Sequence, residues 1–408
     1  MIAHGDFLKI LLLNQTFYPD VAATAQYLSD LALALVQAGH RVTVLTSRAA
    51  YDDPRKRFPP REIWQGVNII RIGSTALGKS AKWRRALDFA SFLAACTLRL
   101  AFLRRFDVVV ALTSPPLISV LGALLARCRG SRFVYWVMDF NPDEALAAGW
   151  LQPGSFAART LERLSRFSLR HAHRIIALDR FMADRIAGKA VPRDRIAVLP
   201  PWALDVHVHY DSAGRERFRQ AHGMDGKFVV MYSGNHSPCH PLNTLLDAAR
   251  RLAGDPGILF CFVGGGSEFR RIQQLLVTDQ LQNVLCLPYQ PLADLAGSLS
   301  AGDLQVVVMG NPFVGLVHPC KIYNILNVGA PVLYLGPRPS HLSEILDRLG
   351  HQHFWTAAGH GEADRLVTQI QWAQRQSSTI TREIPELTAK FSRARILPQL
   401  VEEIIGPG

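Results

Sequence analysis

Short apolar runs alternate with helical patterns along almost the whole of this 408-residue chain. The runs are four to six residues long, and the segments between them carry apolar residues every three or four positions. This alternation predicts repeated strand–helix–strand units, and therefore an α/β fold with parallel sheets. We expect strands at residues 8–13, 41–46, 67–72, 108–112, 133–137, 174–177 and 196–199, and then at 228–233, 259–263, 284–287, 304–308 and 332–335.

A polar stretch separates the two series of predicted strands. It begins at Pro200, ends near Gly226 and contains a short charged segment, residues 215–220, that we expect to be helical. The break predicts two domains, residues 1–205 and 206–385.

Two further segments have patterns that predict their structure. Residues 17–26 are expected to form a loop and residues 27–38 a helix that closes at Gly39. Near the end of the chain, residues 391–405 carry apolar side chains on one side of a helix, where Pro398 should produce a kink or a restart. Such a helix needs a surface to pack on, and the pattern leaves open which domain supplies it.

Composition limits the class of protein. With 49% hydrophobic and 19% charged residues, the chain can bury two cores of ordinary size. Its six cysteines show no close metal-ligand or redox spacing, which favours a reducing compartment. The first residues lack the charged start of a signal peptide, and no uninterrupted apolar run is long enough to span a membrane. We therefore expect a cytoplasmic or membrane-peripheral protein.

The net charge of +12 lies entirely in the first half of the chain. Residues 1–205 hold 28 Lys and Arg against 16 Asp and Glu, whereas residues 206–408 hold 17 of each. This asymmetry indicates an anionic partner such as a membrane surface. Residues 79–105, basic and rich in aromatic and aliphatic side chains, are the candidate contact with anionic lipid, the alternative being a core helix with a solvated cationic end. No nucleic-acid partner is expected, because no basic patch is interleaved with stacking aromatics.

Two segments of the second half have patterns that suit an anionic ligand. His318, Pro319 and Cys320 form a turn before a predicted helix with Lys321 in its first turn, where a diphosphate would fit, although a surface lysine is the plain alternative. Residues 264–268 end a strand in three glycines and enter another helix, which lets a ligand approach the backbone. The glycines do not have the spacing of the dinucleotide fingerprint, so NAD binding is not supported.

Polar loops follow several of the predicted strands. Residues 232–241 hold His236, Cys239 and His240, but the absence of an evident fourth ligand argues against a metal site. In the first half, residues 14–20, 113–116 and 137–142 should meet at one edge of the sheet, because carboxyl ends of parallel strands share an edge. Asp139 in the last loop is either a site carboxylate or a helix cap.

Taken in order along the chain, seven segments resemble those of one enzyme family. They are FYPDVAATAQYLSDLALALVQAGHRVTVLTS (17–47), TSPP (113–116), MDFNPDE (138–144), SGNHSPCHPLNTLLDAA (233–249), FVGGGSE (262–268), NVLCLPYQP (283–291) and HPCKIYNILNVGAPV (318–332). The chain resembles retaining glycosyltransferases of family 4 with the GT-B architecture, and is most similar to the branch that builds bacterial exopolysaccharides and O-antigens, described as colanic-acid or L-fucosamine transferase-like.

The resemblance implies a particular fold and chemistry. We expect two Rossmann-like domains facing across a cleft, with residues 386–408 forming a helix that crosses back to the first domain. The family usually needs no metal, because basic side chains and helix dipoles act on the diphosphate, so no cofactor is expected. The chain departs from the commoner pattern at Asn235 and His240, where many members have Arg and Lys, and at Leu316 and Asn324, where they have two Glu.

The resemblance also implies roles for individual residues. Asp139, His318 and Lys321 would be catalytic, and Phe17, Gln26 and Ser114 would bind the acceptor. The donor would be held by Gly234, Asn235, His240, Gly264, Gly265, Gly266, Glu268, Tyr289, Gln290, Tyr323 and Asn324.

These expectations combine into one predicted function. The protein would move a sugar with retention from a nucleoside-diphosphate sugar to a polyprenyl-diphosphate-linked saccharide, at the inner face of the cytoplasmic membrane. The alternatives are a sugar-nucleotide epimerase of the same fold and a non-catalytic scaffold in a polysaccharide assembly complex.

Overall fold

The computed structural model describes residues 7–20, 22–50, 56–75, 82–204, 207–349, 353–379, 382 and 386–406. The chain divides into two units, which are described separately below. The N-terminal unit is Met1–Pro201 with Ile396–Gly408, and the C-terminal unit is Trp202–Arg395. The chain therefore leaves the first unit at Pro201, slightly before the boundary predicted at residue 205.

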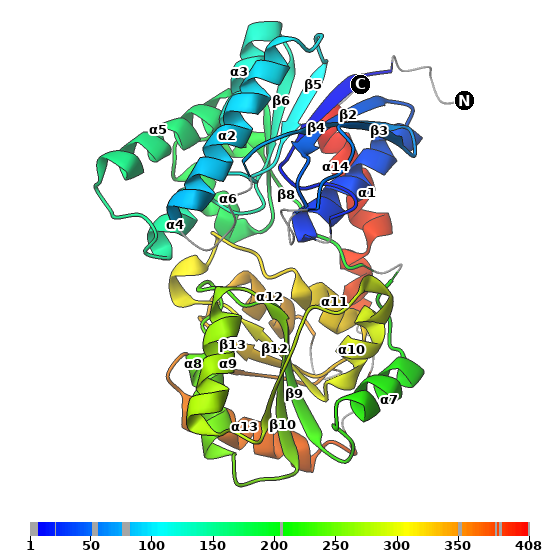
Figure 1. Ribbon diagram of the computed structural model, residues 1–408, viewed down its shortest axis with the longest axis vertical. Coiled ribbons are helices and arrows are strands. Elements are labelled where there is room, and N and C mark those ends of the chain that lie inside the picture. Colours follow the sequence, from blue (N-terminus) through cyan, green and yellow to red (C-terminus); the bar gives the residue numbers. More distant parts are fainter. Residues whose placement is uncertain are drawn as a thin grey trace. The chain divides into compact units, whose positions relative to one another are not determined.

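The N-terminal unit contains an eight-stranded sheet in the order β3-β4-β2-β1-β5-β6-β7-β8, parallel except for the antiparallel pair β3–β4 (Figure 1). All seven strands predicted for this half are present, with ends that differ by at most one residue. The prediction missed β3, because this edge strand is short, half-exposed and charged. The strands are β1 Lys9–Leu13, β2 Arg41–Ser47, β3 Arg61–Trp64, β4 Val67–Ile72, β5 Val108–Ala111, β6 Arg132–Trp136, β7 Arg174–Ala177 and β8 Ile196–Val198.

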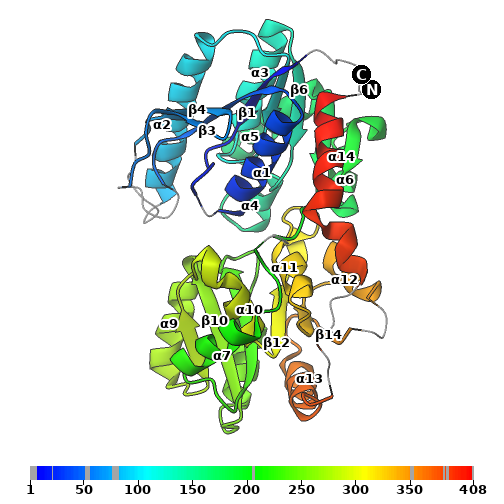
Figure 2. The same ribbon diagram turned by 90° about the vertical axis from the view of Figure 1, so that its right-hand side faces the viewer.

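Helices join these strands and cover the sheet. α3 packs between α2 and α5, as the arrangement of the three helices in Figures 1 and 2 shows. The expected loop over residues 17–26 is wrong in its second part, because α1 already begins at Ala23, where small residues and the buried Ala25 start the apolar face. The helices are α1 Ala23–Gln37, α2 Lys82–Ala101, α3 Ile118–Arg129, α4 Asp143–Ala147, α5 Phe156–His171 and α6 Arg180–Ala187.

The last helix, α14 (Arg393–Ile405), belongs to the N-terminal unit from Ile396 onward. Ile396, Leu400 and Ile404 are buried, as the apolar pattern predicts. The Arg132 guanidinium donates to the carbonyl oxygen of Ile405 at 2.7 Å, and Arg174 forms an ion pair with Glu403. The helix runs through Pro398, so the expected restart does not occur.

The C-terminal unit contains a six-stranded, fully parallel sheet in the order β11-β10-β9-β12-β13-β14. The five predicted strands are present, with β9 and β10 extended by two residues at their carboxyl ends. β14 was missed, because its side chains are mostly half-buried and its apolar run is short. The strands are β9 Phe228–Asn235, β10 Ile258–Gly265, β11 Val284–Leu287, β12 Leu304–Val308, β13 Val332–Leu335 and β14 Trp355–Ala358.

The main core of this unit lies where helices pack on β9, β10, β12 and β13, and it includes Phe260, Val306 and Leu333. The charged segment predicted at 215–220 is part of α7. The helices are α7 Ser212–Ala221, α8 Asn243–Arg251, α9 Ser267–Asp279, α10 Leu295–Ala301, α11 Lys321–Asn327, α12 His341–Asp347 and α13 Ala363–Arg375. Within the described part of the chain, no helix is both long and apolar enough to cross a bilayer.

Candidate functional site

The carboxyl edge of the C-terminal sheet contains a buried, unpaired cation. Lys321 begins α11, and its Nζ lies 3.5 Å from the centroid of the Tyr232 ring. The residue is half-buried, but Nζ itself is buried and has no hydrogen-bond partner among the described residues. Burial lowers the pKa of Lys321 well below its usual value of 10.5. A buried charge without a partner is unfavourable, so an anionic ligand would be strongly favoured here.

Glycines bring the backbone close to this cation. Gly234, the residue before the last in β9, has φ 129°, and a Cβ built on it would lie 3.1 Å from the Lys321 Nζ. Gly264 and Gly266 have φ 135° and 128°, and a Cβ on either would overlap the carbonyl oxygen of Gly234 or His236, respectively. Only glycine allows this approach of the two strand-to-helix turns. Gly266 also precedes α9, so the start of this helix lies at the same turn.

Two histidines lie beside Lys321, and both are neutral. His236 is fully buried with Nδ1 2.9 Å from the Gly234 carbonyl, and Nδ1 of His240 is 2.8 Å from the carbonyl of Val308. Burial, reinforced by the Lys321 charge, lowers the pKa of each ring to about 3. Because each Nδ1 must donate to a carbonyl, Nε2 carries a lone pair. In this state the Nε2 of His240 can only accept a hydrogen bond.

Other predicted donor residues lie along the same edge. A Cβ on Gly265 would lie 3.0 Å from the Tyr289 ring, and the Tyr289 side chain is 52% exposed. Gln290 bonds the carbonyl of Pro288 at 2.9 Å, and the Glu268 amide donates to the His236 carbonyl at 3.1 Å. Asn235, at the end of β9, is exposed.

Three predicted residues of the 318–324 segment make contacts within the C-terminal unit. Tyr323 is 1% exposed, and its hydroxyl lies 2.7 Å from Nε2 of His318. Asn324 accepts a hydrogen bond from the Leu204 amide at 3.0 Å, which holds the first residues of this unit against α11. The His318 ring stacks on His341 with centroids 4.0 Å apart. These side chains organise the segment that presents Lys321.

Sequence reasoning missed Tyr232 as part of the site. The sequence places it only where the predicted strand 228–233 meets the polar loop 232–241. Its fully buried ring lies under the Lys321 ammonium, and its hydroxyl donates to the Asn235 carbonyl at 2.9 Å. No local signal identifies this contact, since the two residues are far apart in the chain and only the β9–β12–α11 packing brings them together.

In the N-terminal unit, three loops meet at the carboxyl edge of the sheet, as predicted. The Gln15 amide donates to the Ser114 carbonyl at 2.6 Å, and the Asp139 amide donates to Oγ1 of Thr113 at 3.3 Å. Burial raises the pKa of Asp139 to about 6. Asp139 does not cap α4, whose N-cap is Pro142. A carboxyl group with this pKa at a ligand-binding edge has the properties of a site residue.

The predicted acceptor residues differ in accessibility. Phe17 is 2% exposed and packs edge-on against Trp64, with ring centroids 5.9 Å apart, so its side chain supports the loop. Gln26 on α1 and Ser114 are half-buried. In the predicted membrane segment, Lys79 lies outside the described residues.

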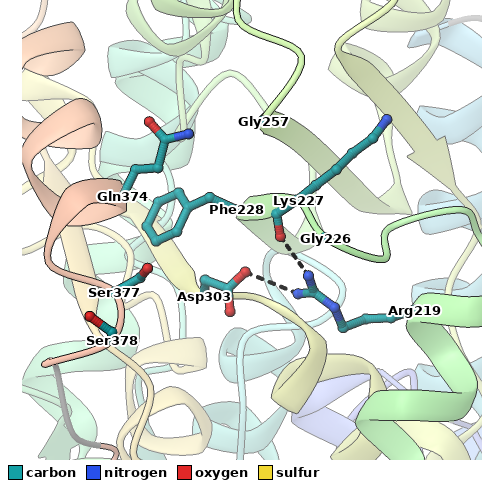
Figure 3. Close-up of a pocket in the computed structure, with 9 residues that line it drawn as sticks. All are labelled: Arg219, Gly226, Lys227, Phe228, Gly257, Asp303, Gln374, Ser377 and Ser378. Atoms are coloured by element: carbon teal, nitrogen blue, oxygen red, sulfur yellow. Dashed lines mark hydrogen bonds and ion pairs between the residues drawn. The ribbon is translucent and has the colours of Figure 1, made fainter.

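A hollow of about 430 Å³ lies at the opposite edge of the C-terminal sheet (Figure 3). Phe228, Gly257 and Asp303, which line it, stand at or before the amino ends of β9, β10 and β12. Arg219 donates to Asp303 at 2.9 Å and to the Lys227 carbonyl, as Figure 3 shows. Ligands of open parallel sheets bind at the carboxyl ends, so this hollow is not the candidate site.

Comparison with known proteins identifies the class. Residues 23–202 match the model of the glycosyl transferase 4-like domain. The chain is 24% identical to WcaI of Escherichia coli K12, named as a colanic acid biosynthesis glycosyl transferase, over 98% of this chain and 100% of WcaI. It is 26% identical to WbjE of Pseudomonas aeruginosa, named as a glycosyltransferase, over 60% of this chain and 62% of WbjE.

Solved structures share the fold over nearly the full length. Sucrose-phosphate synthase from Thermosynechococcus elongatus superposes with a TM-score of 0.73 at 17% identity, covering 96% of this chain and 97% of that one. HepE from Anabaena, in complex with UDP and glucose, gives a TM-score of 0.69 at 18% identity, covering 97% and 98%. Two Rossmann-like parallel sheets with these neighbours define the GT-B fold. The domain match over residues 23–202 and the two named relatives support a glycosyltransferase of family 4.

Proposed function

We propose that the protein transfers a sugar from a nucleoside-diphosphate sugar to a growing saccharide in bacterial surface polysaccharide synthesis, with retention at the anomeric carbon. The observation that carries the proposal is the buried Nζ of Lys321, which has no hydrogen-bond partner among the described residues and lies over Tyr232 at the carboxyl edge of the C-terminal sheet. WcaI is named for colanic acid biosynthesis, and HepE was solved with UDP and glucose, which supports this substrate class.

Lys321 is the proposed electrostatic catalyst. Breaking the bond between the sugar and the diphosphate leaves negative charge on the leaving oxygen, and an ammonium already fixed at that point stabilises the charge without reorganising. The glycine turns at Gly234 and Gly264 pack closely together, and the missing side chain of Gly234 leaves room for phosphate oxygens beside Lys321. In this proposal no divalent metal is needed, because Lys321 supplies the positive charge.

The remaining roles are distributed over both units. We assign Tyr289 and Gln290 to the nucleoside and Glu268 and Asn235 to the sugar, while His240 accepts a hydrogen bond from a sugar hydroxyl through Nε2. Asp139 and His318 are the proposed groups beside the reacting bond. Gln26 and Ser114 are the proposed acceptor contacts, with Phe17 holding their loop.

We propose that the acceptor is lipid-linked and that the enzyme works at the cytoplasmic face of the membrane. α2 supports this assignment, since it exposes the bulky Leu87 (48%) and Leu98 (65%), and Phe102 (76%) follows directly. The small Ala90 and Ala94 lie between them on the exposed side. Arg104 and Arg105 close this apolar stripe with positive charge, the pattern of a helix lying in a membrane interface.

Nucleotide binding and transfer test the proposal in turn. Thermal denaturation with UDP, GDP and their sugars, with and without magnesium, should show stabilisation by one nucleotide class without metal. The stabilising sugar nucleotide is then incubated with membrane lipid extracts, and a sugar-extended lipid is sought by mass spectrometry. A sugar nucleotide altered without lipid would indicate an epimerase instead, and the absence of any nucleotide binding would overturn the proposal in favour of a scaffold.

A further inference from the structure

Helix α5 of the N-terminal unit carries a continuous stripe of arginines on its exposed side. Arg159, Arg163, Arg166 and Arg170 are all exposed, whereas Ala158, Ser165, Ser168 and Leu169 on the other side are buried. Steps of four, three and four residues keep the four arginines within about 60° of the helix surface, over a length of about 16 Å.

An exposed aromatic side chain begins the stripe. Ser155 caps the helix by accepting a hydrogen bond from the Ala158 amide at 3.1 Å, which makes Phe156 the first helical residue. The Phe156 side chain is 80% exposed, and Trp150 in the preceding turn is 43% exposed. The helix therefore presents two aromatic rings near its start, followed by a row of cations.

Helix stability does not account for this stripe. Like charges three or four residues apart repel one another and weaken a helix. Among the described residues, only Arg166 of the four arginines forms an ion pair, with Glu162 at 2.6 Å, and Glu162 also pairs with Lys189 at 2.6 Å. The helix is held in place from its other side, where Ser168 bonds Ser119 of α3 at 3.1 Å. The arginines take no part in this packing.

We propose that the α5 stripe, defined as Phe156, Arg159, Arg163, Arg166 and Arg170, is a second membrane-docking element that binds the phosphates of anionic phospholipids. Guanidinium groups bind phosphates through paired N–H donors, and an aromatic ring at the end of the row anchors at the headgroup level. α3 packs between α5 and α2, so the arginine stripe and the apolar stripe of α2 belong to one layer of helices. This inference rests on the proposed membrane contact of α2 and adds to it a preference for anionic over neutral lipids.

Vesicle co-sedimentation of the full chain tests the proposal. Vesicles of phosphatidylcholine alone are compared with vesicles containing 30% phosphatidylglycerol. The double variant Arg159→Gln/Arg163→Gln should bind the anionic vesicles more weakly by about fivefold for each arginine, and so about 25-fold in all. Phe156→Ser should weaken binding at high salt, where the charge contribution is screened.

Control variants separate this proposal from others. Arg365→Gln/Arg375→Gln alters two exposed arginines on one helix, α13, of the other unit, and should bind like the wild type. Leu98→Ser/Phe102→Ser tests the α2 contact independently. Thermal denaturation should show that every variant is folded. Stabilisation by nucleotide should be unchanged in the α5 variant, so a failure of the membrane-docking proposal can be told from a failure of the proposed transferase activity.

Two results would overturn the inference. One is equal binding of the α5 variant and the wild type to anionic vesicles. The other is wild-type binding to a DNA duplex or to free inorganic phosphate through the same arginines, with no preference for phosphatidylglycerol vesicles.

Discussion

Replacing Lys321 by Met should stabilise the empty protein and damage its function at the same time. Met keeps the length and apolar stem of the side chain but removes the charge from Nζ, which is buried and has no hydrogen-bond partner among the described residues. Two effects compete in the folded state. The contact of Nζ with the Tyr232 ring at 3.5 Å is worth about 0.5–2 kcal/mol, whereas desolvating an unpaired ammonium costs several kcal/mol, so desolvation should dominate.

The direction of the stability change follows from how the unfolding free energy depends on pH. Burial lowers the pKa of Lys321 in the folded state below the value of about 10.4 of an unfolded lysine. Between the two pKa values the unfolded chain binds more protons than the folded one, so wild-type stability increases with pH there, by up to about 1.4 kcal/mol per pH unit. At pH 6 we expect Lys321→Met to be more stable than the wild type by about 1–3 kcal/mol. The advantage should shrink as the pH approaches 10, because the wild-type lysine is then neutral in the folded state.

Activity should respond in the opposite direction. Loss of the charge at the leaving diphosphate should raise the activation free energy by about 2–4 kcal/mol, which lowers kcat/KM by about 30- to 1,000-fold. Stabilisation of the protein by the nucleoside diphosphate should also be largely lost in the variant.

The measurement is urea denaturation at pH 6, 8 and 10, with and without nucleotide, together with initial rates of transfer. Lys227→Met is the matched control, since Lys227 lines the hollow at the opposite edge of the same sheet. A Lys321→Met protein that is less stable than the wild type at pH 6, with an unchanged pH slope, would refute the reasoning that Lys321 is a buried and unpaired cation. Unchanged turnover would remove it from the site.

Three further substitutions test the surroundings of the site and the last helix. Tyr232→Phe removes the hydroxyl that donates to the Asn235 carbonyl but keeps the ring under Lys321. The unfolding free energy should therefore fall by about 0.5–1.5 kcal/mol, while nucleotide affinity changes little. A large loss of affinity would show that the hydroxyl itself binds the ligand. Gly264→Ala should lower the unfolding free energy by at least about 1–2 kcal/mol and weaken nucleotide binding, because the φ of Gly264 is 135° and the new Cβ would overlap the Gly234 carbonyl oxygen. The control is Gly254→Ala, where a Cβ has no neighbour within 4 Å. Equal nucleotide affinities of the two variants would contradict the proposed close approach of the backbone. Glu403→Ala should destabilise the N-terminal unit by about 1–3 kcal/mol, since Arg174 loses its carboxylate partner, and should speed proteolytic removal of α14. Glu402→Ala, which removes an exposed carboxylate, should change neither stability nor proteolysis.

Much of the fold was determined by the sequence alone. Fully buried parallel strands require continuous apolar runs, so twelve of the fourteen strands in the described part of the chain could be located from local pattern. The two missed strands lie at sheet edges, where one side of the strand has no neighbour. The apolar signal of both is weak, because β3 is charged and β14, with the sequence WTAA, is mostly half-buried and has one large apolar residue. The glycines at 264–266 and the lysine at 321 could also be found, because a positive φ favours glycine and the start of a helix is recognisable from the local sequence.

The tertiary structure decided which of these residues act together. It placed the Tyr232 ring under Lys321 and aligned the Gly234 and Gly264 turns, contacts between segments far apart in the chain. It gave Tyr323 and Asn324 partners within the unit, and it tied Nδ1 of His240 to the Val308 carbonyl, which leaves Nε2 as a hydrogen-bond acceptor. The local sequence pattern indicates whether a side chain prefers burial. Its pKa, tautomer and hydrogen-bond partner depend on groups from neighbouring elements, and only the packing of the sheet and its helices determines those neighbours.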